Sequence, residues 1–319
     1  MPLTETVMDN PRSQRIRRLA ELKERRVRQR HERFLIEGPQ SVREAVACRP
    51  DLITDLYVQA GEGPQPSGTR FLNPVVSVIA ESALAHDHIY VHPVTARVMK
   101  AISTDAQGIV AQGDTRAMMV DPSDLWTGHD GPADSGDRQC RGGEGMIAAF
   151  WQVRDPGNAG TVIRTADAAG CRALVLVDDC VDPLNPKVLR STAGSAFHIP
   201  ILAMGTEAFL DWAHRLGYGI MAADVHGTPE RRPTSLPDYL DRSGARGDPT
   251  GPDDQTEHPG RDMVALFGNE ARGLPADLLE QVDSIVSIPI YGRAESLNLA
   301  TSAAVLLYGL AMSSRIERI

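Results

Sequence analysis

The feature that most constrains the fold is a regular alternation of short apolar segments and helical segments, which begins at residue 146. The apolar segments are rich in Val, Ile, Leu and Ala, as is typical of strands buried on both faces. Strands are predicted at 147–151, 173–177, 218–222, 263–267 and 285–288, and helices at 160–169, 186–191, 206–216, 276–279 and 297–312. This alternation predicts an α/β fold in which helices cover both faces of a parallel sheet.

The first part of the chain predicts a second, smaller α/β domain. Its predicted strands are 34–38, 53–59, 75–78 and 109–112, and its predicted helices are 41–48, 81–84 and 94–101; residues 1–11 show no periodicity and are expected to be disordered. We therefore expect an N-terminal domain within 1–118, a flexible acidic linker at 119–145 and a C-terminal domain over 146–319. A second acidic stretch, 231–262, is predicted to be a surface insertion that is disordered at least in part.

Charge is distributed unevenly along the chain. The net charge is −9, which by itself argues against a nucleic-acid partner. Residues 12–33, however, hold ten Arg and Lys residues against three glutamates, and the local field decides phosphate attraction. We interpret this segment as a basic helix, either a solvated charged helix or, as we favour, one that binds a polyanion.

Several classes of protein are disfavoured by what the sequence lacks. There is no GxGxxG after a strand, no GxxxxGK[ST], no GxSxG, no HExxH and no zinc-deaminase cysteine pair. The four cysteines show no CxxC spacing and no metal-ligand pattern, so we expect reduced thiols and no metal. No apolar run reaches 18 residues, and no cleavable apolar segment begins the chain, so we expect a cytoplasmic protein with no membrane partner.

Three glycine-containing loops, each next to a predicted strand of the C-terminal part, are candidates for a site. In the first, Asn158 and Gly160 precede Arg164, and backbone amides followed by an arginine one turn into a helix suit a phosphate. The alternative is a surface arginine paired with Asp167. In the second, glycines bracket Glu270 after a strand, where open α/β sheets bind ligands; for this loop alone, an ordinary strand–turn–helix connection is favoured.

The third loop lies within residues 285–310 and precedes a long apolar helix. Ser296 is predicted to cap this helix, and the helix, apolar nearly all round, is expected to be buried. Ser296 and Asn298 would then be polar groups at a buried helix start, and each would cost roughly 1–3 kcal/mol if left unpaired. They indicate either a ligand or a capped core helix whose Asn298 bonds the preceding loop.

Taken together, the three loops resemble the three motifs of the SpoU/TrmH family of RNA ribose 2′-O-methyltransferases. The first motif is NxGxxxR, from Asn158 to Arg164; the second is FGNExxGL, residues 267–274; the third is Ile288-Pro289 with Ser296-Leu297-Asn298. Order and spacing agree over residues 146–319. A weaker likeness over residues 12–118 extends to the family's ribosomal-protein-like RNA-binding domain.

The resemblance implies properties that spacing alone does not show. It implies a deep C-terminal trefoil knot, which general topology rules disfavour, a homodimer, and S-adenosylmethionine as the cofactor. It implies cofactor contacts and a catalytic set shared between protomers. By position, the cofactor residues are Gly268, Ile288, Ser296 and Leu297, with Leu266 nearby, the catalytic residues are Asn158, Arg164, Glu270 and Asn298, and the RNA contacts are Arg190 with Arg25, Arg26 and Arg28 of the basic segment.

The function implied is methylation of a ribose 2′-OH in RNA, with 23S rRNA favoured because of the separate N-terminal domain. A tRNA methyltransferase and a non-catalytic RNA-binding or ribosome-assembly protein of the same fold are the alternatives. An α/β enzyme with a different nucleotide cofactor is disfavoured by the missing phosphate loops. For Arg164 we favour a clamp on a phosphate and the 2′-oxygen over a general base, because a guanidinium does not deprotonate readily.

Overall fold

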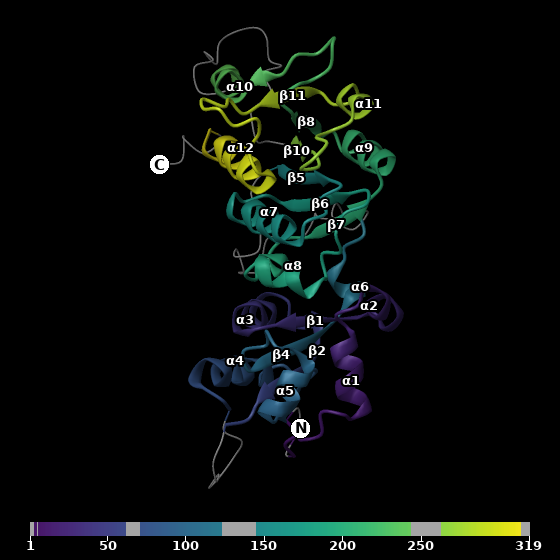
Figure 1. Cartoon of the computed structure of the whole chain (residues 1–319), viewed down its shortest axis with the longest axis vertical. Coiled ribbons are helices and arrows are strands. Elements are labelled where there is room, and N and C mark those ends of the chain that lie inside the picture. Colours follow the sequence, from purple (N-terminus) through teal and green to yellow (C-terminus); the bar gives the residue numbers. More distant parts are fainter. Residues whose placement is uncertain (1–2, 5, 62–70, 123–144, 244–262, 314–319) are drawn as a thin grey trace, which may run out of the picture. The chain divides into compact units, whose positions relative to one another are not determined.

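The computed structural model describes residues 3–4, 6–61, 71–122, 145–243 and 263–313. The chain forms two compact units, which are described separately (Figure 1). Unit 1 comprises Met1–Val120 together with Asp182–His198, and unit 2 comprises Asp121–Val181 together with Ile199–Ile319. The segment Asp182–His198, predicted as part of the C-terminal domain, therefore makes its contacts in unit 1. No helix in the described part of the chain is long and apolar enough to cross a membrane.

Unit 1 is built on a four-stranded mixed sheet with the order β1-β4-β2-β3. Strand β4 pairs antiparallel with β1 and with β2, and β3 lies parallel to β2 at the edge. The strands are β1 (Arg33–Glu37), β2 (Ile53–Gln59), β3 (Tyr90–Val94) and β4 (Ile109–Asp114), and the helices are α1 (Gln14–Glu21), α2 (Arg25–His31), α3 (Pro39–Cys48), η1 (Pro50–Leu52), α4 (Pro74–Leu84), α5 (Ala96–Ile102), α6 (Thr115–Met118), α8 (Pro186–Ser191) and η4 (Ser195–Phe197).

Two of the errors in unit 1 concern strands. Residues 75–78, predicted as a strand, lie in α4, because Asn73 caps this helix by accepting from the Val76 amide and Pro74 suits its first turn. Strand β3 was missed, since Pro93 interrupts its pattern, although an edge strand tolerates proline. Part of the segment predicted to be disordered is ordered along this edge, where the Met8 amide donates to the Pro93 carbonyl.

The basic segment forms two helices instead of the single helix predicted. Helix α1 is capped by Ser13 and buries Ile16 and Leu19 against the unit 1 core, and it is amphipathic in the way a docked surface helix requires. Helix α2 begins after a break at residues 22–24 and ends at His31, since the next residue, Glu32, adopts a left-handed conformation. Most of the segment's cations are thus held on two short, docked helices.

Unit 2 is built on a seven-stranded, all-parallel sheet with the order β7-β6-β5-β10-β8-β11-β9. All five strands predicted for this part are present. The strands are β5 (Met146–Trp151), β6 (Ala173–Val177), β7 (Ile201–Met204), β8 (Gly219–Ala223), β9 (Thr234–Ser235), β10 (Met263–Phe267) and β11 (Ser284–Ser287), and the helices are α7 (Pro156–Ala168), α9 (Thr206–Arg215), α10 (Leu236–Ser243), α11 (Ala276–Leu279) and α12 (Leu299–Ser313).

Helices cover both faces of this sheet, as the alternation predicted. Helices α9 and α11 pack with one apolar face, in a core that includes Phe209 and Trp212, while α7 and α12 pack together beside the other face (Figure 1). Phe150 and Phe267, on adjacent strands, stack with ring centroids 5.0 Å apart. Because apolar contacts cover the faces, a polar site in unit 2 is expected at the ends of the strands.

The acidic insertion and the linker are described only in part. Residues 231–243 include β9, which pairs with β11, and α10, so the beginning of the predicted insertion is ordered. Residues 244–262 and most of the predicted linker, 123–144, lie outside the described residues. Strands β7 and β9 were not predicted; both are short, and only two residues of β7 are buried.

Candidate active site

The three motif loops all follow the carboxyl ends of strands in the sheet of unit 2. Phe150 on β5 and Phe267 on β10 are register partners in adjacent parallel strands, so the first and second loops emerge side by side. Strand β8 joins β10 to β11, which carries the third loop. Parallel strands thus bring together segments that lie more than a hundred residues apart, at the carboxyl ends where open α/β sheets bind ligands.

A hydrogen-bonded chain of three side chains joins the three loops. The Asn158 side-chain amide donates to Glu270 Oε1 at 3.0 Å, and the Asn158 side-chain oxygen accepts from Asn298 Nδ2 at 3.1 Å. Asn158 is itself placed by Asp155, which caps α7 and accepts from the Asn158 backbone amide at 2.8 Å. One residue from each motif is therefore held by the next, and three of the four predicted catalytic residues lie in contact.

Asn298, and not Ser296, caps helix α12. The Asn298 side-chain oxygen accepts from the backbone amides of Ala300 and Thr301 at 2.9 and 3.4 Å, and the helix begins at Leu299. The prediction that Ser296 caps this helix was wrong because the chain runs two residues further before turning. Asn298 thereby satisfies the helix start with its oxygen and reaches Asn158 with its nitrogen.

The second loop is a tight turn that requires its glycines. The backbones of Asn269 and Gly273 exchange two hydrogen bonds, of 3.2 and 2.9 Å, and Gly273 has a φ of +65°. A Cβ atom on Gly268 would lie 2.4 Å from the Gly273 carbonyl carbon, so no larger residue fits. The Asn269 side chain, which is buried, donates to the Gln152 carbonyl at 2.7 Å and ties this turn to the first loop.

A cleft of about 480 Å³ opens beside the hydrogen-bonded chain. Five of the predicted site residues line it, from the second and third loops: Gly268, Glu270, Ile288, Ser296 and Leu297. Leu266 does not, because it is fully buried in the core on β10. Asn158, Arg164 and Asn298 also lie outside the lining.

Sequence reasoning missed one wall of the cleft, which follows β8. Asp224, His226 and Gly227 line the cleft here, and Asp224 Oδ1 accepts from the backbone amides of both other residues at 2.8 Å. The available signal was positional, since β8 lies between β10 and β11 in the sheet. With Glu270 and Glu295, Asp224 gives the lining three carboxylates against the single guanidinium of Arg272.

Arg164 lies on α7 two turns beyond the start of the helix. Its side chain is exposed and forms no ion pair with a described residue, so the alternative of a surface arginine paired with Asp167 is not supported. It is a guanidinium available to an external anion.

The cations of the basic segment in unit 1 divide into two sets. Arg28 was predicted to contact RNA, but its side chain is only 3% exposed. It pairs with Asp182 and donates to the carbonyls of Leu22 and Lys23, so it cannot reach a phosphate. Arg33 pairs with Asp114. These side chains hold the unit together.

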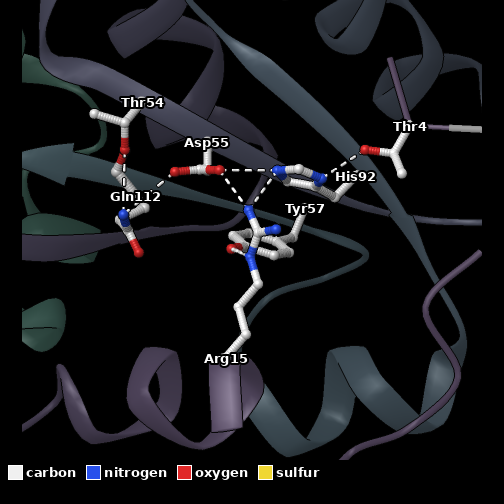
Figure 2. Close-up of polar contacts among 7 residues, drawn as sticks. All are labelled: Thr4, Arg15, Thr54, Asp55, Tyr57, His92 and Gln112. Atoms are coloured by element: carbon white, nitrogen blue, oxygen red, sulfur yellow. Dashed lines mark hydrogen bonds and ion pairs between the residues drawn. The ribbon is translucent and has the colours of Figure 1, made fainter. Parts of the chain in front are cut away.

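Arg15 belongs to the same internally paired set (Figure 2). It donates to Asp55 at 2.6 Å and to the Tyr57 hydroxyl at 2.8 Å, and the His92 ring lies against the same carboxylate at 2.8 Å. Burial raises the pKa of Asp55, but the hydrogen bonds from His92 and Thr54 and the charge of Arg15 outweigh it, so this pKa lies below its usual range.

The other seven cations of the segment are exposed, and none of them pairs with a described carboxylate. They are Arg12, Arg17, Arg18, Lys23, Arg25, Arg26 and Arg30. Arg190, the remaining predicted RNA contact, is half-buried and pairs with Glu37 and Asp105 of unit 1. The predicted contacts that remain free are therefore Arg25 and Arg26.

Comparison with known proteins agrees with this geometry. Residues 145–308 match the family model described as the SpoU rRNA Methylase family, and residues 13–111 match the MRM3-like substrate binding domain. The first match covers the sheet of unit 2 with all three motif loops. The second covers both basic helices and most of the sheet of unit 1.

Individual relatives point the same way. The chain is 40% identical over 160 residues to the 23S rRNA (guanosine(2553)-2'-O)-methyltransferase RlmP of Bacillus subtilis (strain 168). This match covers 50% of this chain and 54% of that protein. The chain is also 28% identical to the 23S rRNA (guanosine-2'-O-)-methyltransferase RlmB of Bordetella pertussis. This match covers 86% of this chain and 95% of that protein. The chain spans only about half the length of the curated relatives that it matches at higher identity.

A solved structure resembles the chain over its full length. An AdoMet-bound rRNA methyltransferase from Sinorhizobium meliloti superposes with a TM-score of 0.69 at 26% identity and covers 100% of both chains.

Proposed function

Because the chain belongs to the SpoU rRNA methylase family, we propose that it transfers a methyl group from S-adenosylmethionine to a ribose 2′-OH of 23S rRNA. The observation that carries this proposal is the hydrogen-bonded chain from Glu270 through Asn158 to Asn298, beside a cleft at the carboxyl edge of the sheet. The substrates named for the Bacillus and Bordetella relatives support 23S rRNA. An rRNA substrate would place the protein in the cytoplasm.

The cleft fits the proposed cofactor in size and in charge. A volume of about 480 Å³ is within the usual range of small-molecule sites. S-adenosylmethionine carries a sulfonium, an ammonium and one carboxylate, and the cleft presents the carboxylates of Asp224, Glu270 and Glu295 and one guanidinium. Gly268, Ile288 and Leu297 would form its apolar walls, while Leu266 would support them from the core.

The residues beside the cleft would act mainly by positioning. A bound methyl donor supplies the electrophile, and orienting two bound reactants can contribute about 7–11 kcal/mol to the lowering of a barrier. Asn158 is fixed on both sides of its amide, so it can hold a ribose or phosphate oxygen in one orientation. Arg164 would clamp a substrate phosphate and the 2′-oxygen, and the proton would pass to a phosphate or to water.

Kinetics of Arg164 variants can distinguish the clamp from a general base. We expect Arg164→Ala to lower the single-turnover rate, and we expect no ionisation in the pH–rate profile that belongs to Arg164. Loss of RNA binding with an unchanged single-turnover rate would contradict the clamp.

Family membership further implies a trefoil knot and a homodimer in which Asn158 and Arg164 face the partner's cofactor. The outer face of α12 supports the dimer. Val305, Tyr308 and Met312 are 41%, 41% and 61% exposed and follow one another at helical spacing along one face. This helix, expected to be buried all round, thus keeps an apolar face that a second copy can cover. Analytical ultracentrifugation tests this proposal. The unsubstituted chain should sediment as a dimer, and Tyr308→Glu should shift the equilibrium toward the monomer.

Unit 1 would bind the RNA through the seven exposed cations of its basic segment. This assignment agrees with the match to the MRM3-like substrate binding domain and favours rRNA over the tRNA alternative. The non-catalytic alternative is disfavoured by the retained side chains Asn158, Arg164, Glu270 and Asn298.

The decisive experiment combines calorimetry with labelled methyl transfer. S-adenosylmethionine should bind the full chain, and a tritiated methyl group should appear in 23S rRNA but not in tRNA. Gly268→Ala should weaken cofactor binding at least tenfold, because its Cβ would collide with the backbone at Gly273. Cofactor binding without transfer to any RNA would favour the non-catalytic alternative, and transfer to tRNA alone would overturn the rRNA assignment.

A further inference from the structure

Three side chains of different chemistry converge in unit 1, outside the candidate active site. Glu44 and Cys48 lie one turn apart on α3, and His198 ends the segment Asp182–His198 of the same unit. A carboxylate oxygen, the Cys48 Sγ and a His198 ring nitrogen all lie within 4.8 Å of one another, and all three residues are half-buried. From this convergence we propose a zinc site formed by Glu44, Cys48 and His198.

The carboxylate is already oriented as a metal ligand would be. Glu44 Oε1 accepts from Arg43 Nη2 at 2.9 Å and from Gln40 Nε2 at 3.2 Å. The other oxygen, Oε2, faces His198 Nε2 at 3.4 Å, which is too long for a good hydrogen bond. In metal sites, hydrogen bonds from surrounding residues orient the side chains that bind the metal. Here they direct Glu44 Oε2 toward the point where the three groups meet.

The backbone opposite α3 is shaped to fit Glu44. Gly194 has a φ of +104°, and a Cβ atom there would lie 2.3 Å from Glu44 Cγ. Only glycine allows the segment to lie this close to the helix, which fixes His198 four residues later opposite Glu44. The backbone of α3 and the close approach at Gly194 therefore fix the positions of the three side chains.

The ligand set selects zinc. A thiolate, an imidazole and a carboxylate leave the fourth tetrahedral position to water, and bond lengths of about 2.0–2.3 Å would require only a small closure of the three groups. The Cys48 thiol would lose its proton to solvent as the zinc–sulfur bond forms, and no electron is transferred. The sequence predicted no metal because the cysteines show no CxxC spacing and no metal-ligand pattern with the histidines; Cys48 and His198 are 150 positions apart.

Bound zinc would connect α3 to the segment that carries α8. This role is structural and independent of methyl transfer, since none of the three ligands belongs to the cleft of unit 2. We therefore expect zinc to raise the thermal midpoint of the full chain and to leave cofactor affinity unchanged.

The test uses the full-length protein stripped of metal with a chelator. One equivalent of Zn²⁺ should bind in competition with a chromophoric chelator, and Co²⁺ in its place should give the thiolate-to-metal charge-transfer absorption of a tetrahedral site. Zn²⁺ should also protect Cys48 from alkylation, as read by peptide mass spectrometry. Cys48→Ser and His198→Gln should each weaken Zn²⁺ binding at least tenfold and abolish the cobalt absorption.

Matched controls are Cys180→Ser and His214→Gln in unit 2, which should leave Zn²⁺ affinity unchanged. The proposal is overturned if wild-type protein gives no thiolate–cobalt absorption, or if Cys48 is alkylated at the same rate with and without Zn²⁺. It is also overturned if the control variants lose Zn²⁺ as the ligand variants do. The alkylation arm needs no variant, so a substitution that fails to fold cannot obscure the result.

Discussion

The motif loops of unit 2 and the basic segment of unit 1 make an instructive contrast. Each was singled out as a set of polar side chains with one purpose. In unit 2 three of the four predicted catalytic residues meet, because Asn158 hydrogen-bonds to both Glu270 and Asn298. In unit 1 the set divided, because Arg15, Arg28 and Arg33 are used in ion pairs within the unit.

The difference lies in what each pattern specifies. A spaced motif fixes residue types relative to strand ends and helix starts, so the parallel sheet brings its members to one edge. A run of like charge fixes no geometry, and each cation is free to find its own nearest carboxylate. Four variants test this contrast, in order of decreasing effect.

The largest effect is expected from Arg28→Met. The substitution removes a buried guanidinium and leaves Asp182 without its partner, which should cost about 3 kcal/mol of unfolding free energy. Arg25→Met, on the same helix but exposed, should change it by less than about 0.5 kcal/mol. Urea unfolding followed by circular dichroism measures both. Equal stabilities would show that burial does not separate the two sets of cations.

Asn158→Ala should break the chain that joins the three loops. We expect the single-turnover methyl-transfer rate to fall about 100-fold, since misplacing a catalytic group has effects of that size. Cofactor affinity should be retained, because Asn158 does not line the cleft. Thr161→Ala, one turn further along α7, is the control, since among the described residues its hydroxyl bonds only the Gly157 carbonyl of the same helix. A rate unaffected by Asn158→Ala would remove the observation on which the proposed function rests.

Asp55→Asn should reveal the cost of holding Arg15 inside unit 1. The folded-state pKa of Asp55 lies below the value of about 3.9 for an unfolded chain, so its ionisation stabilises the fold above that pH. This stabilisation is lost as the pH falls through the folded pKa. We expect a loss of about 1.5 kcal/mol at pH 7 that shrinks below pH 4. Asp87→Asn, at an exposed position, should show neither change; a loss that is the same at both pH values would contradict the ion pair.

The smallest effect is expected from the double substitution Arg25→Gln and Arg26→Gln. If both guanidiniums bind phosphates, the slope of log affinity against log salt should flatten by roughly 0.7–0.9 for each phosphate that is no longer neutralised. Fluorescence anisotropy with labelled rRNA at several salt concentrations measures this slope. Arg215→Gln, on α9 of unit 2, is the matched control. An unchanged slope would mean that the exposed cations are merely solvated.

Periodicity predicted the five main strands of unit 2 because each is a buried apolar segment between turn signals. It failed where a local rule was overridden, as at Val75, a β-branched residue that Asn73 and Pro74 draw into α4. The site was predictable as far as its motifs reached. Its third wall was not, because Asp224 belongs to no motif and becomes part of the cleft only through the position of β8 in the sheet.

The residue that caps helix α12 could not be predicted from the sequence either. Ser296 and Asn298 are both good caps, and only the path of the chain before α12 decides between them. The burial of Arg28 likewise depends on Asp182, a residue more than 150 positions away. Such outcomes follow from long-range packing, which spacing along the chain does not contain.

The segment Asp182–His198 bears on how this protein could have been assembled. Its residues come from between β6 and β7, yet its helix α8 contacts β1, and Leu189 is almost fully buried. The two units are thus not consecutive in the sequence. Unit 1 includes a segment that lies within the residues matched by the methylase family model. A chimera that exchanges only residues 1–120 should therefore fold poorly unless the segment Asp182–His198 is exchanged with them.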